Sequence, residues 1–259
     1  MITLLNGEEW NEANILDRMY DDSFYYGHLG QYALSSSSLK KLLQSPKAYQ
    51  ASLRMSDSSQ ALRDGRLVHL AVLEKHKLGD LVIINGTKAK KEFKEAVAEH
   101  GEDMVYTESE MSNAYWIADA IHSNSEASYL LSDCQYEMPG VAMIDDIPFR
   151  AKADALGSNG SVIIDLKTTS AGVNDFYYSA RKFNYGLQAA LYMRIFNATD
   201  FIFLVVDKQT KDIGIFSCSG EFLEKGTDDI YKGIDIYKTF FLSENSEELI
   251  KNNVIRGIL

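Results

Sequence analysis

Residues 161–169, SVIIDLKTT, place an acid and a lysine at the end of an apolar run. If the run is a β-strand, alternate side chains share a face, so Asp165 and Lys167 lie together while Leu166 points into the core. The Leu166 carbonyl then lies between the two charged groups. Taken alone, an acid and a lysine at this spacing are most often a surface ion pair, so any chemistry depends on the neighbouring elements.

A second acid, Asp154, lies in the preceding candidate strand, residues 149–156. A turn centred on residues 158–159 predicts an antiparallel register with Asp154 opposite Ile163. Asp154 is then a diagonal neighbour of Asp165, about 7–8 Å away. Two carboxylates this close raise one pKa unless a cation lies between them, and Mg²⁺ prefers such oxygen ligands. Lys167 beside the ion could orient a water or stabilise charge on a phosphate.

Two predicted helices carry further polar residues. In residues 185–196, Gln188 and Tyr192 are four residues apart and share one helical face. In residues 64–74, Gly65 and His69 have the same spacing, and a mid-helix glycine costs roughly 1 kcal/mol relative to alanine. Taken singly, the first stretch is more simply explained as an amphipathic helix with Gln188 at its polar boundary, and the second as a helix with a hydrogen-bonded histidine in the core.

The elements around these residues predict a mixed α/β sheet with helices on both faces. We expect one domain over residues 1–259: a mainly helical part (1–130), the catalytic sheet with the Gln188 helix (131–218), and C-terminal helices (219–259). The expected strands are 81–84, 134–138, 141–155, 161–168, 201–206 and 213–218, with turn residues at 145–146 and 157–160. The expected helices are 38–45, 59–75, 88–100, 107–121, 175–196, 221–241 and 247–258, with a capping box at Thr107 and Glu110.

The composition excludes several classes of protein. A net charge of -11 argues against a general polyanion binder. Two cysteines, Cys134 and Cys218, indicate no disulfide framework and a reducing compartment. Neither a membrane-spanning apolar run nor a signal-peptide pattern is present, so we expect a cytoplasmic protein.

The motifs in order, GRLVH, Glu137, FRAKAD, IIDLKTT and LQAALY, resemble the PD-(D/E)XK nuclease superfamily. More narrowly they resemble its RecE-type exodeoxyribonuclease VIII branch, related to the RecB nuclease domain and lambda exonuclease. The stretch SSSSLKKLLQSPKAYQAS resembles the opening of that branch, and the resemblance covers residues 33–206. It departs from the superfamily name at Lys152 and Ala153, where the literal Pro-Asp is absent. The resemblance implies a restriction-endonuclease-like core.

The resemblance also implies roles for individual residues. Asp154 and Asp165 correspond to the catalytic acids and Lys167 to the catalytic lysine. The implied metal ligands are His69, Asp154, Asp165 and the Leu166 carbonyl, with Glu137 as a further candidate of less weight. Residues expected to contact DNA or shape the site are Gln188, Tyr192, Arg66, Lys152, Arg181 and Lys182. The implied cofactor is Mg²⁺, with Mn²⁺ as a substitute, and two cysteines are too few for an iron–sulfur cluster.

The predicted function is a Mg²⁺-dependent exodeoxyribonuclease, acting 5′→3′ on linear double-stranded DNA to generate single strands for recombination or repair. The implied partners are DNA ends, a single-strand annealing protein and, as a ring-shaped homo-oligomer, further copies of the chain. Several basic residues are expected to line one groove inside an otherwise negative surface: the candidates are Lys40, Lys41, Lys47, Arg63, Arg66, four lysines in residues 88–94, Arg181 and Lys182. The lysines of residues 88–94 are more simply explained as a solvated helix face. The resemblance also implies a bacterial or phage-infected cell. Two alternatives stay open: an endonuclease acting on structured or foreign DNA, and a catalytically silent DNA-binding module.

Overall fold

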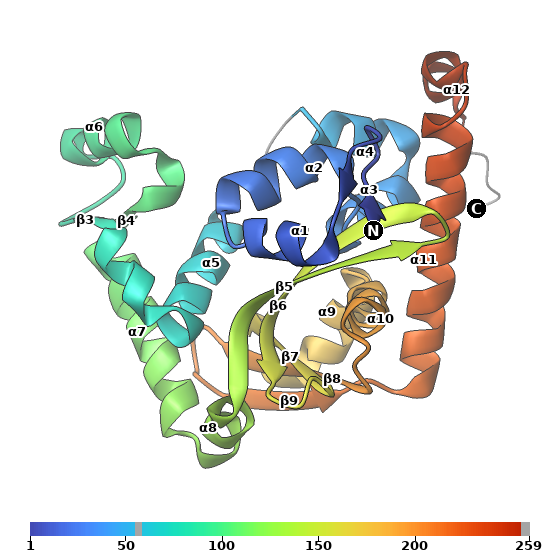
Figure 1. The fold of residues 1–259 in the computed structure, drawn as a ribbon. Coiled ribbons are helices and arrows are strands. Elements are labelled where there is room, and N and C mark those ends of the chain that lie inside the picture. The colour runs from blue at the N-terminus through green and yellow to red at the C-terminus, as the bar shows by residue number, and fades with distance from the viewer. Residues whose placement is uncertain (55–58, 255–259) are drawn as a thin grey trace.

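A five-stranded mixed sheet forms the centre of the computed structural model, which describes residues 1–54 and 59–254 (Figure 1). The strand order is β5-β6-β7-β8-β9, with β7 and β8 parallel and every other neighbouring pair antiparallel. The strands are β5 (Cys134–Ile144), β6 (Ile147–Gly157), β7 (Val162–Thr169), β8 (Asp200–Asp207) and β9 (Ile213–Ser217). The predicted mixed α/β fold with flanking helices is confirmed.

Helices cover both faces of this sheet. One face carries α5 (Gln60–Leu73), α7 (Glu108–Ser123) and α8 (Ser125–Ser132), and the other carries α9 (Phe176–Lys182) and α10 (Tyr185–Phe196). Ile164 and Leu166 are buried in the first cluster, whereas Ile163 is buried in the second. Because side chains alternate along a strand, Asp165 and Lys167 share the face of Ile163, toward α10.

The N-terminal segment is attached to β6 through a single backbone bridge. Leu34 pairs in parallel with Phe149, and this contact fixes the start of α3 (Ser36–Gln44). The remaining elements of this half are β1 (Ile2–Thr3), β2 (Glu9–Trp10), α1 (Glu12–Arg18), the π-helical η1 (Ser23–His28), α2 (Leu29–Tyr32) and α4 (Pro46–Ser52). The sequence did not predict β1 to α2, which are short.

A smaller unit projects from the ends of α5 and α7, away from the central sheet (Figure 1). It consists of the parallel pair β3 (Val82–Ile84) and β4 (Val105–Thr107) with α6 (Lys91–His100). The predicted capping box is present at the start of α7, where the Thr107 side chain and Glu110 satisfy each other's backbone N–H groups. Three 3₁₀ turns complete the connections: η2 (Lys75–Asp80), η3 (Glu102–Met104) and η4 (Val173–Asp175).

The long helix α11 (Gly220–Phe241) packs against α10 and α3, and α12 (Ser246–Asn252) follows it. Gly226 of α11 lies directly on the backbone of Gly186 in α10, with no room for a Cβ atom. The predicted final helix ends earlier, at Asn252, and its expected residues 255–258 lie outside the described residues. In the part of the chain that the structure describes, no helix has the length and apolar character needed to span a membrane.

Three predicted boundaries are wrong for local reasons. β5 continues past residue 138 through Pro139, which an edge strand tolerates, and the chain turns at the expected residues Asp145 and Asp146, both with positive φ. The predicted helix over 175–196 is two helices, because Asn184 adopts a left-handed φ of 49° between them. The cap of α3 is Ser35 rather than Ser38.

The predicted register of β6 and β7 is wrong by two residues. Leu156, not Asp154, lies opposite Ile163, and the turn is centred one residue later than expected. Gly160 supplies a positive φ of 72° there. The Asn159-Gly160 pair is itself a common hairpin signal and could have located the turn. A two-residue shift leaves the side chains on their predicted faces.

Candidate active site

The candidate site begins where β6 and β7 stop pairing. Their ladder ends at Ala155 and Ile164, and the next residue of β6 is Asp154. Its carboxylate accepts a hydrogen bond of 2.8 Å from the backbone N–H of Leu166. A side chain therefore replaces the backbone partner that a continuing ladder would have supplied, and Asp154 is held against β7.

His69 of α5 contacts the same residue of β7 from the other side. Its Nε2 atom lies 2.8 Å from the Leu166 carbonyl oxygen, and its Nδ1 lies 3.6 Å from Asp154 Oδ2. When Nε2 carries the proton and donates it to this carbonyl, Nδ1 keeps a lone pair directed toward the Asp154 side. The Leu166 oxygen retains a second lone pair. The imidazole, the carbonyl and the carboxylate thus converge.

Glu137 of β5 completes a group of three potential metal ligands. Ligand atoms of His69, Glu137 and Asp154 all lie within 4.8 Å of one another. Glu137 has a left-handed φ of 50°, which costs roughly 1–2 kcal/mol in a residue other than glycine. Burial, with Asp154 and Glu74 nearby, raises the pKa of Glu137 to about 8. A strained, desolvated acid beside a second acid fits a site for a hard divalent cation.

Asp165 and Lys167 form a buried ion pair on the neighbouring strand. Lys167 Nζ lies 2.5 Å from Asp165 Oδ2, and Gln188 Nε2 donates a 2.6 Å hydrogen bond to Asp165 Oδ1. Apart from Lys167, no donor of the described residues reaches Oδ2, so this oxygen keeps a second, open lone pair. Asp165 is buried, with 1% of its surface exposed.

Electrostatics keep the Lys167 ammonium protonated. Burial lowers the pKa of Lys167, but the carboxylates of Asp165 and Asp154 outweigh it, and the pKa is raised above its ordinary value. Burial raises the pKa of Asp165, and Asp154 adds to this increase while Lys167 opposes it. Lys167 is thus a fixed positive charge beside the acids, suited to holding an anion rather than to acting as a base.

α10 contributes more than Gln188. Tyr185 lies one turn before Gln188, and the Lys167 ammonium lies 5.1 Å from the centre of its ring. Lys40 of α3 reaches the same ring, 5.0 Å from its centre. Tyr192 lies one turn after Gln188 and packs on Phe201, and burial raises its pKa well above the ordinary value. Both tyrosines therefore lie beside the acids on the stripe that Gln188 defines.

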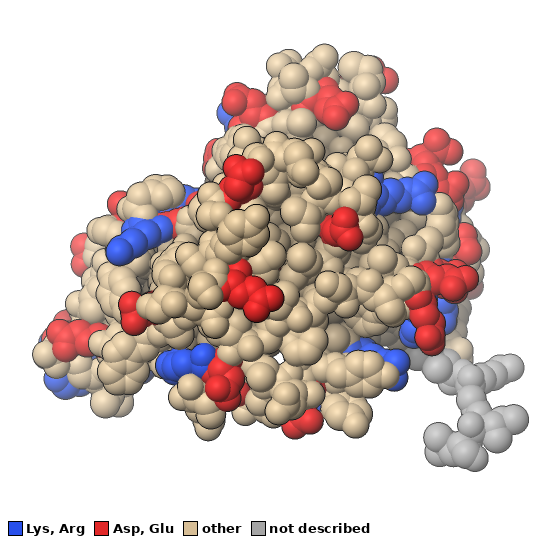
Figure 2. All heavy atoms as spheres, turned by 90° about the horizontal axis from the view of Figure 1, so that it is seen from below, with Lys and Arg blue, Asp and Glu red and all other residues tan. Residues whose placement is uncertain are grey.

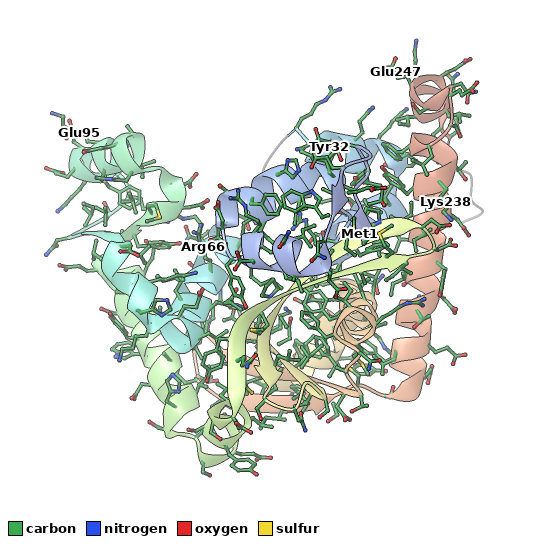
Figure 3. All side chains as sticks on the ribbon, in the orientation of Figure 1. Met1, Tyr32, Arg66, Glu95, Lys238 and Glu247 are labelled. Atoms are coloured by element: carbon green, nitrogen blue, oxygen red, sulfur yellow. The ribbon has the colours of Figure 1, made fainter. Side chains whose placement is uncertain are left out.

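The other predicted DNA contacts have their direct partners outside this cluster, although the Lys152 ammonium opposes the rise in the pKa of Glu137 that burial causes. Lys152 is engaged by Asp22 at 2.8 Å and lies over the Tyr25 ring. Arg66 pairs with Asp103 at 3.3 Å and lies on the side of α5 toward the N-terminal helices (Figure 3). Arg181 and Lys182 are exposed on α9 and contact aromatic rings, not the acids.

The predicted basic groove gathers fewer residues than expected. Arg63 is buried and donates to the backbone carbonyls of Glu102 and Val105, and Lys88 pairs with Glu110 at 2.7 Å. Lysines 90, 91 and 94 belong to the projecting unit around α6. On the face drawn in Figure 2, acidic side chains are scattered and the basic ones lie singly. Of the predicted groove residues, Lys40 lies beside the candidate acids.

Sequence reasoning missed Tyr185, placed Lys40 only in a general basic groove and gave Glu137 little weight as a ligand. Tyr185, Gln188 and Tyr192 are spaced i, i+3, i+7, the pattern of one helical stripe, so Tyr185 could have been found. No local pattern marks Lys40, because its position depends on the bridge between Leu34 and β6.

The fold and this cluster together define the class of the protein, which is an α/β protein of the PD-(D/E)XK type. Comparison with protein families agrees: residues 35–248 match the family described as "PDDEXK-like domain of unknown function (DUF3799)". This match spans most of the chain, so the protein belongs to that family.

Solved structures support the fold assignment. A "putative exonuclease" from Eubacterium rectale is 17% identical, covering 92% of this chain and 95% of its own, with a TM-score of 0.63. At this identity the likeness shows a shared fold alone. A phage-related exonuclease from Haemophilus somnus 129PT is 14% identical over 82% of this chain and 97% of its own, and its TM-score of 0.36 carries no argument. A search of curated proteins found no match.

Proposed function

We propose that the protein is a Mg²⁺-dependent exodeoxyribonuclease that degrades linear double-stranded DNA in the 5′→3′ direction. The observation that carries the proposal is the meeting of two groups at the end of the β6–β7 ladder. One group is His69, Glu137 and Asp154, and the other is the ion pair of Asp165 and Lys167. Membership of a PDDEXK-like family supports a nuclease in general, and the finer statements are our proposal.

The residues fit a divalent metal ion by their chemistry. Two carboxylates and an imidazole converge, and no cation of the described residues pairs with Glu137. His69, Asp154 and Glu137 would hold Mg²⁺ or Mn²⁺, with the Leu166 carbonyl and the open lone pair of Asp165 Oδ2 as further ligands. When bound, the metal supplies Lewis acidity toward a phosphate and an acidified water.

The protein's own groups have separate tasks in phosphodiester hydrolysis. Lys167 holds the nonbridging oxygens of the scissile phosphate and offsets the negative charge that develops on them. Gln188 fixes Asp165 through Oδ1, so the carboxylate orients Lys167 through Oδ2. The Leu166 N–H holds Asp154 in place by a 2.8 Å hydrogen bond. No covalent bond between enzyme and DNA is required.

An exposed stretch of α9 is suited to the DNA strand outside the reaction centre. Tyr177 and Tyr178 are 52% and 70% exposed, Phe183 follows them, and Arg181 stacks on Tyr177 at 4.1 Å. Phe183 contacts the Tyr185 ring at 5.9 Å between centroids, which makes the aromatic surface continuous with the site. Alternating aromatic and basic side chains are typical of surfaces that stack unpaired bases. We propose that Arg181 and Lys182 contact the DNA there.

The test compares linear and covalently closed circular DNA, each with Mg²⁺ and with EDTA. We expect Mg²⁺-dependent loss of the linear form alone. Cleavage of both forms would identify an endonuclease. If neither form is cleaved, the protein is a silent binding module. Asp165→Ala is expected to abolish the activity, whereas Asp119→Ala, at an exposed site on α7, is expected to retain it. Duplexes blocked by phosphorothioates at either the 5′ or the 3′ ends test the polarity.

The product of this activity would be single-stranded DNA for recombination or repair. A single-strand annealing protein is the proposed recipient, and a ring-shaped homo-oligomer the proposed assembly. Light scattering on the purified chain measures the assembly, and pull-down with a purified single-strand annealing protein tests the partner. A monomer at working concentration would contradict the ring without affecting the proposed chemistry.

A further inference from the structure

A second lysine, Lys40, reaches the candidate site from a part of the chain that contains none of the predicted acids. It lies on α3, and its ammonium is 5.0 Å from the centre of the Tyr185 ring. Lys167 approaches the same ring at 5.1 Å. Two ammonium groups, from α3 and from β7, therefore converge on one aromatic side chain beside Asp165.

The position of Lys40 is fixed rather than adventitious. The bridge between Leu34 and Phe149 ties the start of α3 to β6, and Ser35 caps the helix. The flanking residues Leu39 and Leu42 are both fully buried. A surface lysine would be free to turn into solvent, whereas this helix is packed so that Lys40 faces the site.

The two lysines differ in their anionic partners. Lys167 pairs with Asp165 at 2.5 Å, whereas Lys40 forms no ion pair with any carboxylate of residues 1–54 and 59–254. Burial lowers the pKa of Lys40 to about 8, and Lys167 adds to this decrease while Asp165 opposes it. A desolvated ammonium with only an aromatic partner is costly, and an incoming anion would offset that cost.

We propose that Lys40 and Tyr185 form a second phosphate site, which binds a phosphate of the DNA strand adjacent to the scissile one. The ammonium offers three donors, and the Tyr185 hydroxyl offers a fourth. Burial raises the pKa of that hydroxyl, so it keeps its proton at neutral pH. Lys167 then holds the reacting phosphate while Lys40 sets the register of the strand. The inference rests on the proposed nuclease function.

Binding without cleavage tests the site. Lys40→Met removes the charge at nearly constant length, Lys40→Arg keeps the charge, and Lys232→Met is a matched control at an exposed lysine of α11. In EDTA, we expect Lys40→Met to weaken binding of a duplex with a single-stranded end about tenfold and to lower the salt dependence by about one phosphate contact. Lys40→Arg should retain most of the wild-type affinity and salt dependence, and Lys232→Met should change neither.

Neutral methylphosphonates introduced one at a time locate the phosphate. In the wild-type protein one position near the cleavage point should weaken binding about tenfold, and the same position should have no further effect in Lys40→Met. Equal sensitivity of both proteins at every position would overturn the proposal, as would a Lys40→Met variant with wild-type affinity. Circular dichroism and thermal unfolding check that each variant is folded. If Lys40→Met does not fold, Lys40→Arg provides the decisive comparison.

The outcomes separate this inference from the proposed function. If the wild-type protein cleaves no DNA with Mg²⁺, the nuclease function fails and the second phosphate site fails with it. If the wild-type protein cleaves DNA but Lys40→Met binds and cleaves equally well, only the second phosphate site is wrong. Steady-state kinetics add a further readout, because loss of a ground-state phosphate contact should raise KM about tenfold and leave kcat nearly unchanged.

Discussion

The two halves of the candidate site differ in the sign of their excess charge. Between α5, β5 and β6, the acids Glu137 and Asp154 meet His69 with no ion-pairing lysine or arginine on Glu137 among the described residues. Between β7, α10 and α3, Lys167 and Lys40 share one aromatic ring and a single buried acid, Asp165. The first half thus carries an excess of negative charge and the second an excess of positive charge, as expected where a metal ion and a phosphate are brought together.

Leu166 joins the two halves through its backbone. Its N–H holds Asp154 and its carbonyl contacts His69, while its side chain lies in the core. The boundary between the halves is therefore the point where β6 and β7 separate. A rigid backbone at that point keeps both charge groups in place without either neutralising the other.

The largest expected effect is on the acidic half. Asp154→Asn keeps the shape of the side chain but removes its charge, so we expect cleavage of linear DNA with Mg²⁺ to fall by about 10³-fold or more and metal binding to be lost. Rates over a range of Mg²⁺ concentrations and calorimetric metal titration measure both. Asp119→Asn on α7 is the control, and activity of Asp154→Asn within tenfold of wild type would show that this half is not the metal site.

A smaller loss of activity is expected when the basic half is altered, and it should leave metal binding intact. Lys167→Met should lower kcat by about 10²-fold while Mg²⁺ still binds, because the lysine acts on the phosphate and not on the metal. The comparison with Asp154→Asn is made by calorimetry on both variants. If Lys167→Met also lost the metal, the division of the site into two halves would be wrong.

Gln188 acts on the basic half only through Asp165. We expect Gln188→Ala to reduce kcat by about 10–100-fold, since it frees a carboxylate that orients Lys167, and to leave the affinity for DNA nearly unchanged. Gln44→Ala, at an exposed residue of α3, should have no effect. A change in DNA affinity without a change in kcat would instead assign Gln188 to substrate binding.

The smallest effect is on stability and concerns Glu137. Its pKa is raised from 4.5 to about 8, so between these values the native state binds more protons than the unfolded state. In EDTA, the free energy of unfolding should therefore fall as the pH rises from about 5 to 8, by at most about 1.4 kcal/mol per pH unit. Glu137→Gln should flatten this slope.

Mg²⁺ provides the complementary measurement, since it binds the ionised carboxylate. Its stabilising effect should be larger at pH 8 than at pH 6, as urea unfolding with and without the ion can determine. A wild-type slope equal to that of Glu137→Gln would mean that this acid carries no excess proton in the native state.

Much of the site could be predicted because it follows from local geometry. The pairing of Asp165 and Lys167 on one face requires only that residues 162–169 form a strand, and the apolar run ensures that. Gln188 and Tyr192 share a stripe once residues 185–196 form a helix. The capping box of Thr107 and Glu110 is likewise encoded within four residues.

Other features could not be predicted, because distant parts of the chain decide them. The β6–β7 register was missed by two residues, and the basic groove was predicted from lysines and arginines whose partners, such as Glu110 for Lys88, lie far away in the sequence. The importance of Glu137 as a candidate metal ligand depends on its left-handed backbone conformation within β5. Charge alone does not reveal whether a lysine is paired, and only packing decides this.

The sequence by itself thus determined which strand and which helix carry Asp165, Lys167 and Gln188, since both periodicities are properties of the backbone. The tertiary structure decided which charges meet. Packing α5 on one face of the sheet brings His69 to Leu166, and joining Leu34 to β6 brings Lys40 to Tyr185. These contacts link residues far apart in the chain, where burial of apolar surface, not local propensity, fixes the geometry.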